Sequence, residues 1–269
     1  MNLAVRTGTM FVALMMLACS MSGCATFNVF EQHAGVVSSQ NYLDSGVQVV
    51  RGQPRPVIDA VGKVFGTPNR IALGNRSVDN HAISPETEQQ IVNYLEDQQL
   101  DSVLVRVNQY DPVGEFKRMH ANKDIRPAWK LTAGSYNWLK YTLLPGRITG
   151  GDWYNPYSQT LNLYSDVAPL AISRAAYAQD IRSRVNPGAY AAISEIPGVG
   201  LKHETTATQL AIEWYAQRRP DQLEAAKNVI YPNYGASWGG QLGAFLPYGE
   251  VLGRLAGGLA GRAANEFRR

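Results

Sequence analysis

Three polar side chains have the spacing of a metal site within one Ala-rich stretch, LAISRAAYAQD, at residues 170–180. Helical residues four positions apart face the same way, so Ser173 and Tyr177 stand where two ligands can share one metal ion, with position 174 available for a general base. Zinc hydrolysis at such a site needs two neutral imidazoles and a carboxylate. The sequence has a hydroxyl, a phenol and the cation Arg174 instead. We therefore expect no bound metal, no other cofactor and no catalytic residue here.

Upstream segments predict the elements that position this stretch. A serine N-cap followed by a proline begins a helix over residues 84–99, and a shorter amphipathic helix is expected over residues 57–65. Valines alternate with other residues over 103–107, which is typical of a strand. A hairpin is expected from one strand over residues 148–153 and a second over residues 160–164.

Downstream, the Ala-rich helix begins after Ser165 or Asp166, and a loop rich in Pro and Gly separates it from a second helix that runs from about Lys202 to Pro220. On that second helix Glu204 lies in line with an apolar face made of Ala207, Ala211 and Tyr215. The expected fold class is α+β, a small antiparallel or mixed sheet with an Ala-rich central helix and a second packing helix.

In layout, LYSDVAPLAISRAAYAQD and the later HETTATQLAIEW resemble the edge strand, active helix and third-ligand helix of zincin-like metallopeptidases, over about residues 100–220. In that family His-Glu-x-x-His binds zinc, commonly ending Ala-Gly-His-Ala-Lys-Asp, and a Glu often follows on the next helix. The resemblance places Ser173, Arg174 and Tyr177 at the motif and Glu204 at the third ligand. It implies a domain whose metal motif is degenerate, with Arg174 paired to Glu204.

The Ala-rich helix has a second interpretation that stays open, and a possible nucleophile motif elsewhere is set aside. Residues 166–182 also fit an Ala-rich core helix without peptidase ancestry, because small residues let helices approach closely. GASWG at residues 235–239 matches a nucleophile elbow around Ser237, but the hydrolase chain order needs a later histidine and the last one is His203. Ser237 is therefore set aside. The four histidines have no metal-ligand spacing, and we expect them at the surface or as caps: His33, His81, His120 and His203.

The N-terminus, MNLAVRTGTMFVALMMLACSMSGC, predicts a lipoprotein signal peptide over residues 1–23. Met21-Ser22-Gly23-Cys24 resembles a bacterial lipobox, and it is favoured over Cys19 because bulky Leu17 stands where a small residue is required. Cys24 would then carry the lipid anchor, and no disulfide could form because Cys19, the other of the two cysteines, is removed with the signal peptide. In a Gram-negative host, Ala25 predicts sorting to the periplasmic face of the outer membrane.

Composition limits the remaining function classes. The net charge of +3 includes Arg6 of the signal peptide and is too small and dispersed for a nucleic-acid partner. The about 245 residues that remain fit one large domain with appended segments. We expect a polar tether over residues 24–53, the α+β domain over 54–225 and a glycine-rich helical segment over 226–269.

That last segment contains a glycine ladder with a period of four residues, formed by Gly249, Gly253, Gly257 and Gly261. Each Gly in an exposed helix costs about 1 kcal/mol relative to Ala, so close packing must offset the loss. The partner could be a helix of the same protein, a neighbouring copy in a homo-oligomer, or a helix in a membrane. Charged residues within the segment argue against an ordinary transmembrane helix.

Together these features predict a membrane-anchored lipoprotein with a non-catalytic binding or scaffolding role toward an envelope protein or peptide. One alternative is a peptidase-like hydrolase with a rearranged site. Another is a protein driven into membranes or oligomers by the glycine ladder.

Overall fold

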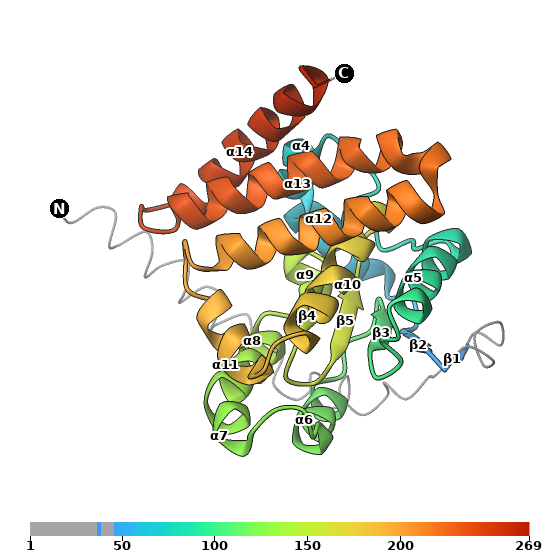
Figure 1. Cartoon of the computed structure of the whole chain (residues 1–269), viewed down its shortest axis with the longest axis vertical. Coiled ribbons are helices and arrows are strands. Elements are labelled where there is room, and N and C mark those ends of the chain that lie inside the picture. The colour runs from blue at the N-terminus through green and yellow to red at the C-terminus, as the bar shows by residue number, and fades with distance from the viewer. Residues whose placement is uncertain (1–36, 39–45, 269) are drawn as a thin grey trace. The chain divides into compact units, whose positions relative to one another are not determined.

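The described residues of the computed structural model, 37–38 and 46–268, build an α+β fold around a mixed five-stranded sheet (Figure 1). The predicted signal peptide and Cys24 lie outside the described residues. The strand order is β1-β2-β3-β5-β4, with β2, β3 and β5 mutually parallel and the outer strands β1 and β4 antiparallel to their neighbours. The strands are β1 (Val37–Ser38), β2 (Gln48–Arg51), β3 (Leu104–Val107), β4 (Trp153–Asn155) and β5 (Thr160–Leu163).

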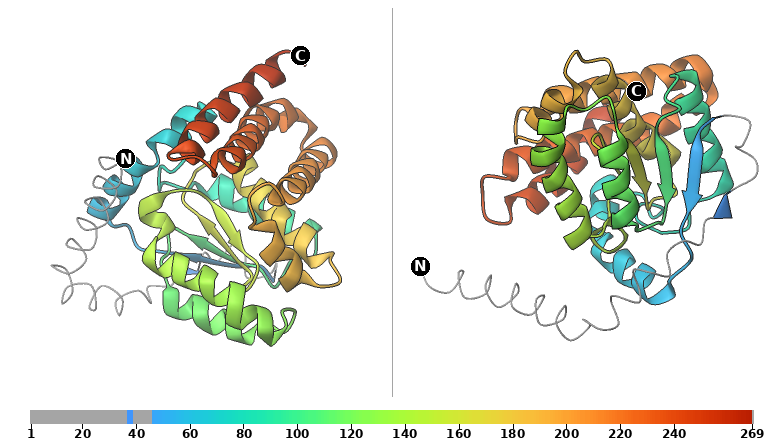
Figure 2. Two further views of the ribbon diagram at one scale, coloured as in Figure 1. Left: turned by 90° about the vertical axis from the view of Figure 1, so that its left-hand side faces the viewer. Right: turned by 90° about the horizontal axis from the view of Figure 1, so that it is seen from below.

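Helices cover both faces of this sheet. Figure 2 shows the green helices α6 to α8 on one side and the orange helices α12 and α13 on the other. The bounds are α3 (Pro56–Phe65), α4 (Thr67–Leu73), α5 (Pro85–Asp97), α6 (Pro112–Ala121), α7 (Pro127–Trp129), the π-helix η2 (Lys130–Gly134), α8 (Ser135–Leu143), α9 (Gly146–Thr149), α10 (Ala168–Arg182), α11 (Pro187–Ser194), α12 (Gly200–Arg218), the 3₁₀ helix η3 (Pro220–Gln222), α13 (Leu223–Gly243) and α14 (Gly249–Glu266).

Two sequence predictions need correction. Strand β2 lies inside the range predicted as a tether, residues 24–53, because Val47 and Val49 alternate inward and are buried in the core. The first strand of the hairpin was predicted over 148–153, but β4 begins at Trp153 and runs to Asn155, so the two ranges share one residue. The beginning of the predicted range forms α9 instead, and the backbone then passes through positive φ at Gly150 and Gly151 before the strand starts.

The two faces of the sheet differ in character. Val105 and Leu161 point with their neighbours toward α5, α10 and α12 and form the main hydrophobic core. On α10, Ala171 and Ala175 are fully buried, which lets this helix lie close to its neighbours. The opposite face carries Arg106 and other buried polar residues beneath α6.

The glycine ladder of α14 packs against glycines of α13 in the same chain. A Cβ on Gly239 would overlap the carbonyl oxygen of Gly253, and a Cβ on Gly253 would overlap that of Gly239. The same relation holds between Gly235 and Gly257, and between Gly243 and Gly249. The two backbones therefore lie in direct contact, side by side in Figure 1.

Helices α13 and α14 are integral to the domain, although a boundary was predicted between residues 225 and 226. Helix α13 runs across that boundary and contributes Ile230 to the main core. Helix α14 is fixed to α4, where Arg262 donates to the carbonyl of Ala72 at 3.3 Å. Among the described helices, none has both the length and the apolar character that crossing a bilayer requires.

Replacing Gly253 by Leu should destabilise the fold by about 3 kcal/mol or more, because the side chain can be accommodated only if α13 and α14 separate. Ala256→Leu is the matched control, since Ala256 is exposed on the same helix. Urea unfolding followed by circular dichroism measures both. Equal stability of the two variants would contradict the intramolecular role of the ladder.

Candidate functional site

A cleft of about 240 Å³ opens beside the edge strand β4, between that strand and helices α8, α10, α11 and α12. It brings together segments far apart in the sequence. Its polar and aromatic lining includes Asn137, Lys140, Trp153, Tyr154, Arg174, Tyr177, Glu195, His203 and Glu204.

Three of the four predicted degenerate metal positions meet in this cleft. Arg174 lies 3.6 Å from Glu204 between guanidinium and carboxylate, which confirms the predicted ion pair. The same guanidinium donates to the hydroxyl of Tyr177 and to the side-chain oxygen of Asn233, each at 3.0 Å. Ser173 does not join them, because its hydroxyl donates back to the Pro169 carbonyl at 2.9 Å. A cation therefore holds the carboxylate that a metal ion would need.

Next to this group, a second buried cluster joins α10, α11 and α12. Asp180 accepts hydrogen bonds from His203 Nδ1 and from the Tyr190 hydroxyl, and it pairs with Arg184. Burial alone would raise the pKa of Asp180, but the hydrogen bonds from His203, Tyr190 and Arg184 lower it. Burial lowers the pKa of His203, which favours a neutral ring that donates from Nδ1 and leaves Nε2 as an acceptor.

The prediction that the histidines lie at the surface is wrong for two of them. His203 and His81 are both buried, and His81 Nδ1 lies 3.2 Å from the side-chain oxygen of Asn108. His120 is exposed, and His33 lies outside the described residues. The burial of His203 follows from its contact with Asp180, because a buried acid needs a hydrogen-bond donor.

A second cavity, of about 560 Å³, shares the lining residues Lys140, Trp153 and Arg174 with the cleft. Helix α14 supplies Glu250 and Arg254 to this second cavity. Its other polar lining residues are Asn69, Thr149, Asp152, Ser165 and Asn233. No local pattern in the sequence linked the glycine-rich helix to this cleft.

Asp152 is the most perturbed acid of the second cavity. Its Oδ1 accepts the backbone N–H groups of Tyr164 at 2.6 Å and Ser165 at 3.0 Å, while Oδ2 has no hydrogen-bond partner among the described residues. Burial and the neighbouring charge of Asp79 raise the pKa of Asp152 to about 7.

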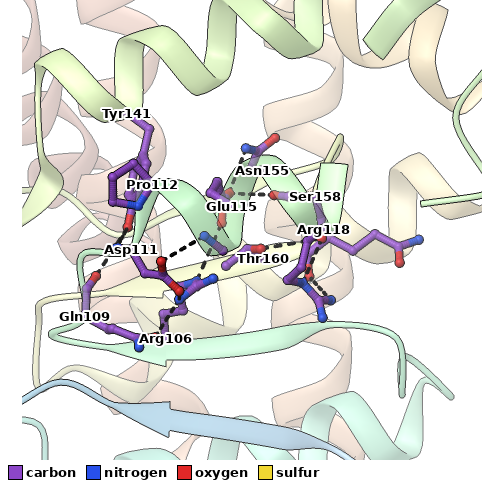
Figure 3. A network of polar contacts seen from close by, with 12 residues as sticks. Arg106, Gln109, Asp111, Pro112, Glu115, Arg118, Tyr141, Asn155, Ser158 and Thr160 are labelled. Atoms are coloured by element: carbon purple, nitrogen blue, oxygen red, sulfur yellow. Dashed lines mark hydrogen bonds and ion pairs between the residues drawn. The ribbon is translucent and has the colours of Figure 1, made fainter. Parts of the chain in front are cut away.

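A buried polar network holds the β4–β5 hairpin from beneath (Figure 3). Glu115 of α6 accepts from Asn155 at 2.8 Å and from Ser158 at 2.5 Å, at the end of β4 and in the turn after it. Arg106 of β3 lies 3.5 Å from Glu115 and 3.1 Å from Asp111, the N-cap of α6. These contacts fix the position of the edge strand that borders the cleft.

Two further findings in the described chain concern metal binding and Ser237. No group of three or more His, Cys, Asp or Glu side chains could hold a metal ion within residues 46–268. Ser237, in the sequence GASWG, lies inside α13 and not at a strand-to-helix turn. No family model, curated protein or solved structure matches the sequence.

Asp152→Asn should stabilise the protein more at high pH than at low pH. A carboxyl whose pKa is raised on folding binds more protons folded than unfolded, so its contribution to stability falls as pH rises from about 4 to about 7. The variant's advantage should therefore grow by about 2 to 3 kcal/mol between pH 5 and pH 8 in urea unfolding.

Asp166→Asn is the control for this experiment. Burial raises the pKa of Asp166, but hydrogen bonds from Thr87 and Ser84 lower it overall, so Asp166 is ionised in both states above pH 5. Its loss of stability should stay constant over the same range. An equally constant effect of Asp152→Asn would show that Asp152 is ionised in the folded protein.

Proposed function

We propose that the protein is a lipid-anchored component of the bacterial cell envelope that binds an extended peptide, without catalysis, in the cleft beside β4. The observation that carries this proposal is the Arg174–Glu204 ion pair in a cleft bordered by an edge strand. The pair supports binding over hydrolysis, because it neutralises the carboxylate best placed to hold a metal or activate water.

The edge strand supports an extended ligand. Within the described residues β4 pairs with β5 alone, so its other edge retains backbone donors and acceptors. A peptide can satisfy these groups by adding one strand to the sheet, while side-chain pockets choose its sequence. Trp153 and Tyr154 are half-buried and line the cleft along this edge, which suits apolar contact with such a strand.

A matched pair of aromatic variants tests this function. Purified full-length protein is incubated with randomised N-acetylated hexapeptides, and retained peptides are counted by mass spectrometry after gel filtration. Trp153→Ala should lower retention about tenfold by removing one wall of the cleft. Phe267→Ala, which replaces an exposed aromatic outside the lining of both cavities, should leave it unchanged. Failure of the wild-type protein to retain any peptide would contradict the proposal.

Metal analysis separates this function from the alternative of a rearranged hydrolase. Elemental analysis of the same preparation should find zinc far below one ion per chain. Stoichiometric zinc, or hydrolysis of the hexapeptides that a chelator stops, would instead favour the enzyme.

The location rests on the lipobox and has its own test. Cys24→Ser should abolish incorporation of labelled palmitate in bacterial cells and release the protein from the membrane fraction. Cys19→Ser should leave both unchanged. If labelling instead depended on Cys19, the predicted cleavage site would be wrong.

A further inference from the structure

We infer that the peptide bound beside β4 ends in the second cavity, where its free C-terminal carboxylate is received by Arg254 and Lys140. This inference rests on the proposed function and specifies its ligand as the C-terminal segment of another polypeptide.

The direction of β4 sets the direction of a peptide paired to it. Strand β4 leaves the second cavity, which includes Gly151 and Asp152, at Trp153, and it leads through Tyr154 to Pro156 in the first cavity. A peptide that pairs antiparallel to β4 runs the opposite way. The C-terminal residues of such a peptide therefore lie at the second cavity.

The second cavity contains positively charged side chains. Lys140 and Arg254 line the second cavity, and neither forms an ion pair within 4 Å with any acid among the described residues. Among the described residues, the guanidinium of Arg254 has one hydrogen bond, to the side-chain oxygen of Asn69 at the long distance of 3.5 Å. Arg174, by contrast, is already held by Glu204. The ammonium of Lys140 lies 5.8 Å from the centroid of the Tyr136 ring, so within the described residues both cations of this cavity lack a paired acid.

Four acidic side chains lie in the second cavity or act on Arg254 through their charges. Asp152 and Glu250 line the same cavity, and Glu204 and Asp79 also act on Arg254 through their charges. Burial and the neighbouring Arg174 lower the pKa of Arg254, because both disfavour its charged form. A carboxylate bound next to Arg254 would stabilise that charged form. Asp152, with its pKa near 7, carries only part of a negative charge at neutral pH.

The Arg254 side chain is packed against α13. The aliphatic part of Arg254 packs against Gly240 of α13, where a Cβ would overlap it. This contact and the backbone contact of the two helices position the aliphatic part of Arg254 before a ligand arrives. Pre-organisation of this kind lowers the entropic cost of binding.

The test compares two hexapeptide pools that differ only at the C-terminus. One pool is N-acetylated with a free carboxylate, the other N-acetylated with a C-terminal amide. Wild-type protein should retain the acid pool at least about tenfold better, as expected for a lost charge-assisted hydrogen bond. Arg254→Gln should abolish this preference and leave retention of the amide pool unchanged. Arg76→Gln, an exposed arginine outside the cavity lining, should behave as wild type.

Each other outcome has a separate meaning. Equal retention of the two pools by wild-type protein would overturn the carboxylate site and leave the peptide function intact. No retention of either pool would overturn both. Arg254→Lys, which keeps the charge, should preserve the preference within about threefold and controls for folding of the Gln variant. Loss of the preference in Arg254→Lys together with an unchanged circular dichroism spectrum would show that charge alone is not what is recognised.

Discussion

The close contact of the α13 and α14 backbones is the constraint on which the cleft depends. Glycine faces glycine at three points of this interface, 235/257, 239/253 and 243/249, so the helices approach more closely there than side chains would allow. This approach brings Arg254 to the second cavity and Asn233, on α13, to the guanidinium of Arg174. A segment that looks like a membrane or assembly element in sequence therefore builds one wall of the candidate site.

The Arg174 cluster shows how a buried ion pair is tolerated. Removing two charges from water costs several kcal/mol per ion, and the attraction between them offsets this only when further hydrogen bonds are made. Tyr177 and Asn233 accept hydrogen bonds from the Arg174 guanidinium. Together with Glu204 they offset the free energy lost when the guanidinium is removed from water. An arrangement of this kind favours one geometry over others and keeps the cleft polar.

Local signals predicted the α+β class, the Ser84-capped helix α5 and the start of β5, each from a pattern within one segment. The Arg174–Glu204 pair was instead predicted from the resemblance in layout to the peptidase motif. Strand β2 was missed because four residues in a polar stretch are too few to show a clear alternation. The hydrogen-bonded Asp180 and His203, the raised pKa of Asp152 and the place of Arg254 were missed because they arise from burial among distant segments, which periodicity does not encode.

The position of β1 bears on how far the domain can stand from a membrane. This strand begins at Val37, much closer to Cys24 than the predicted end of the tether at residue 53. An extended chain spans at most ~3.5 Å per residue, so a lipid on Cys24 would hold the first strand within about 45 Å of the bilayer surface. Such an anchor would limit the distance of the cleft from the bilayer. The cleft could then bind only peptides that come close to the membrane surface.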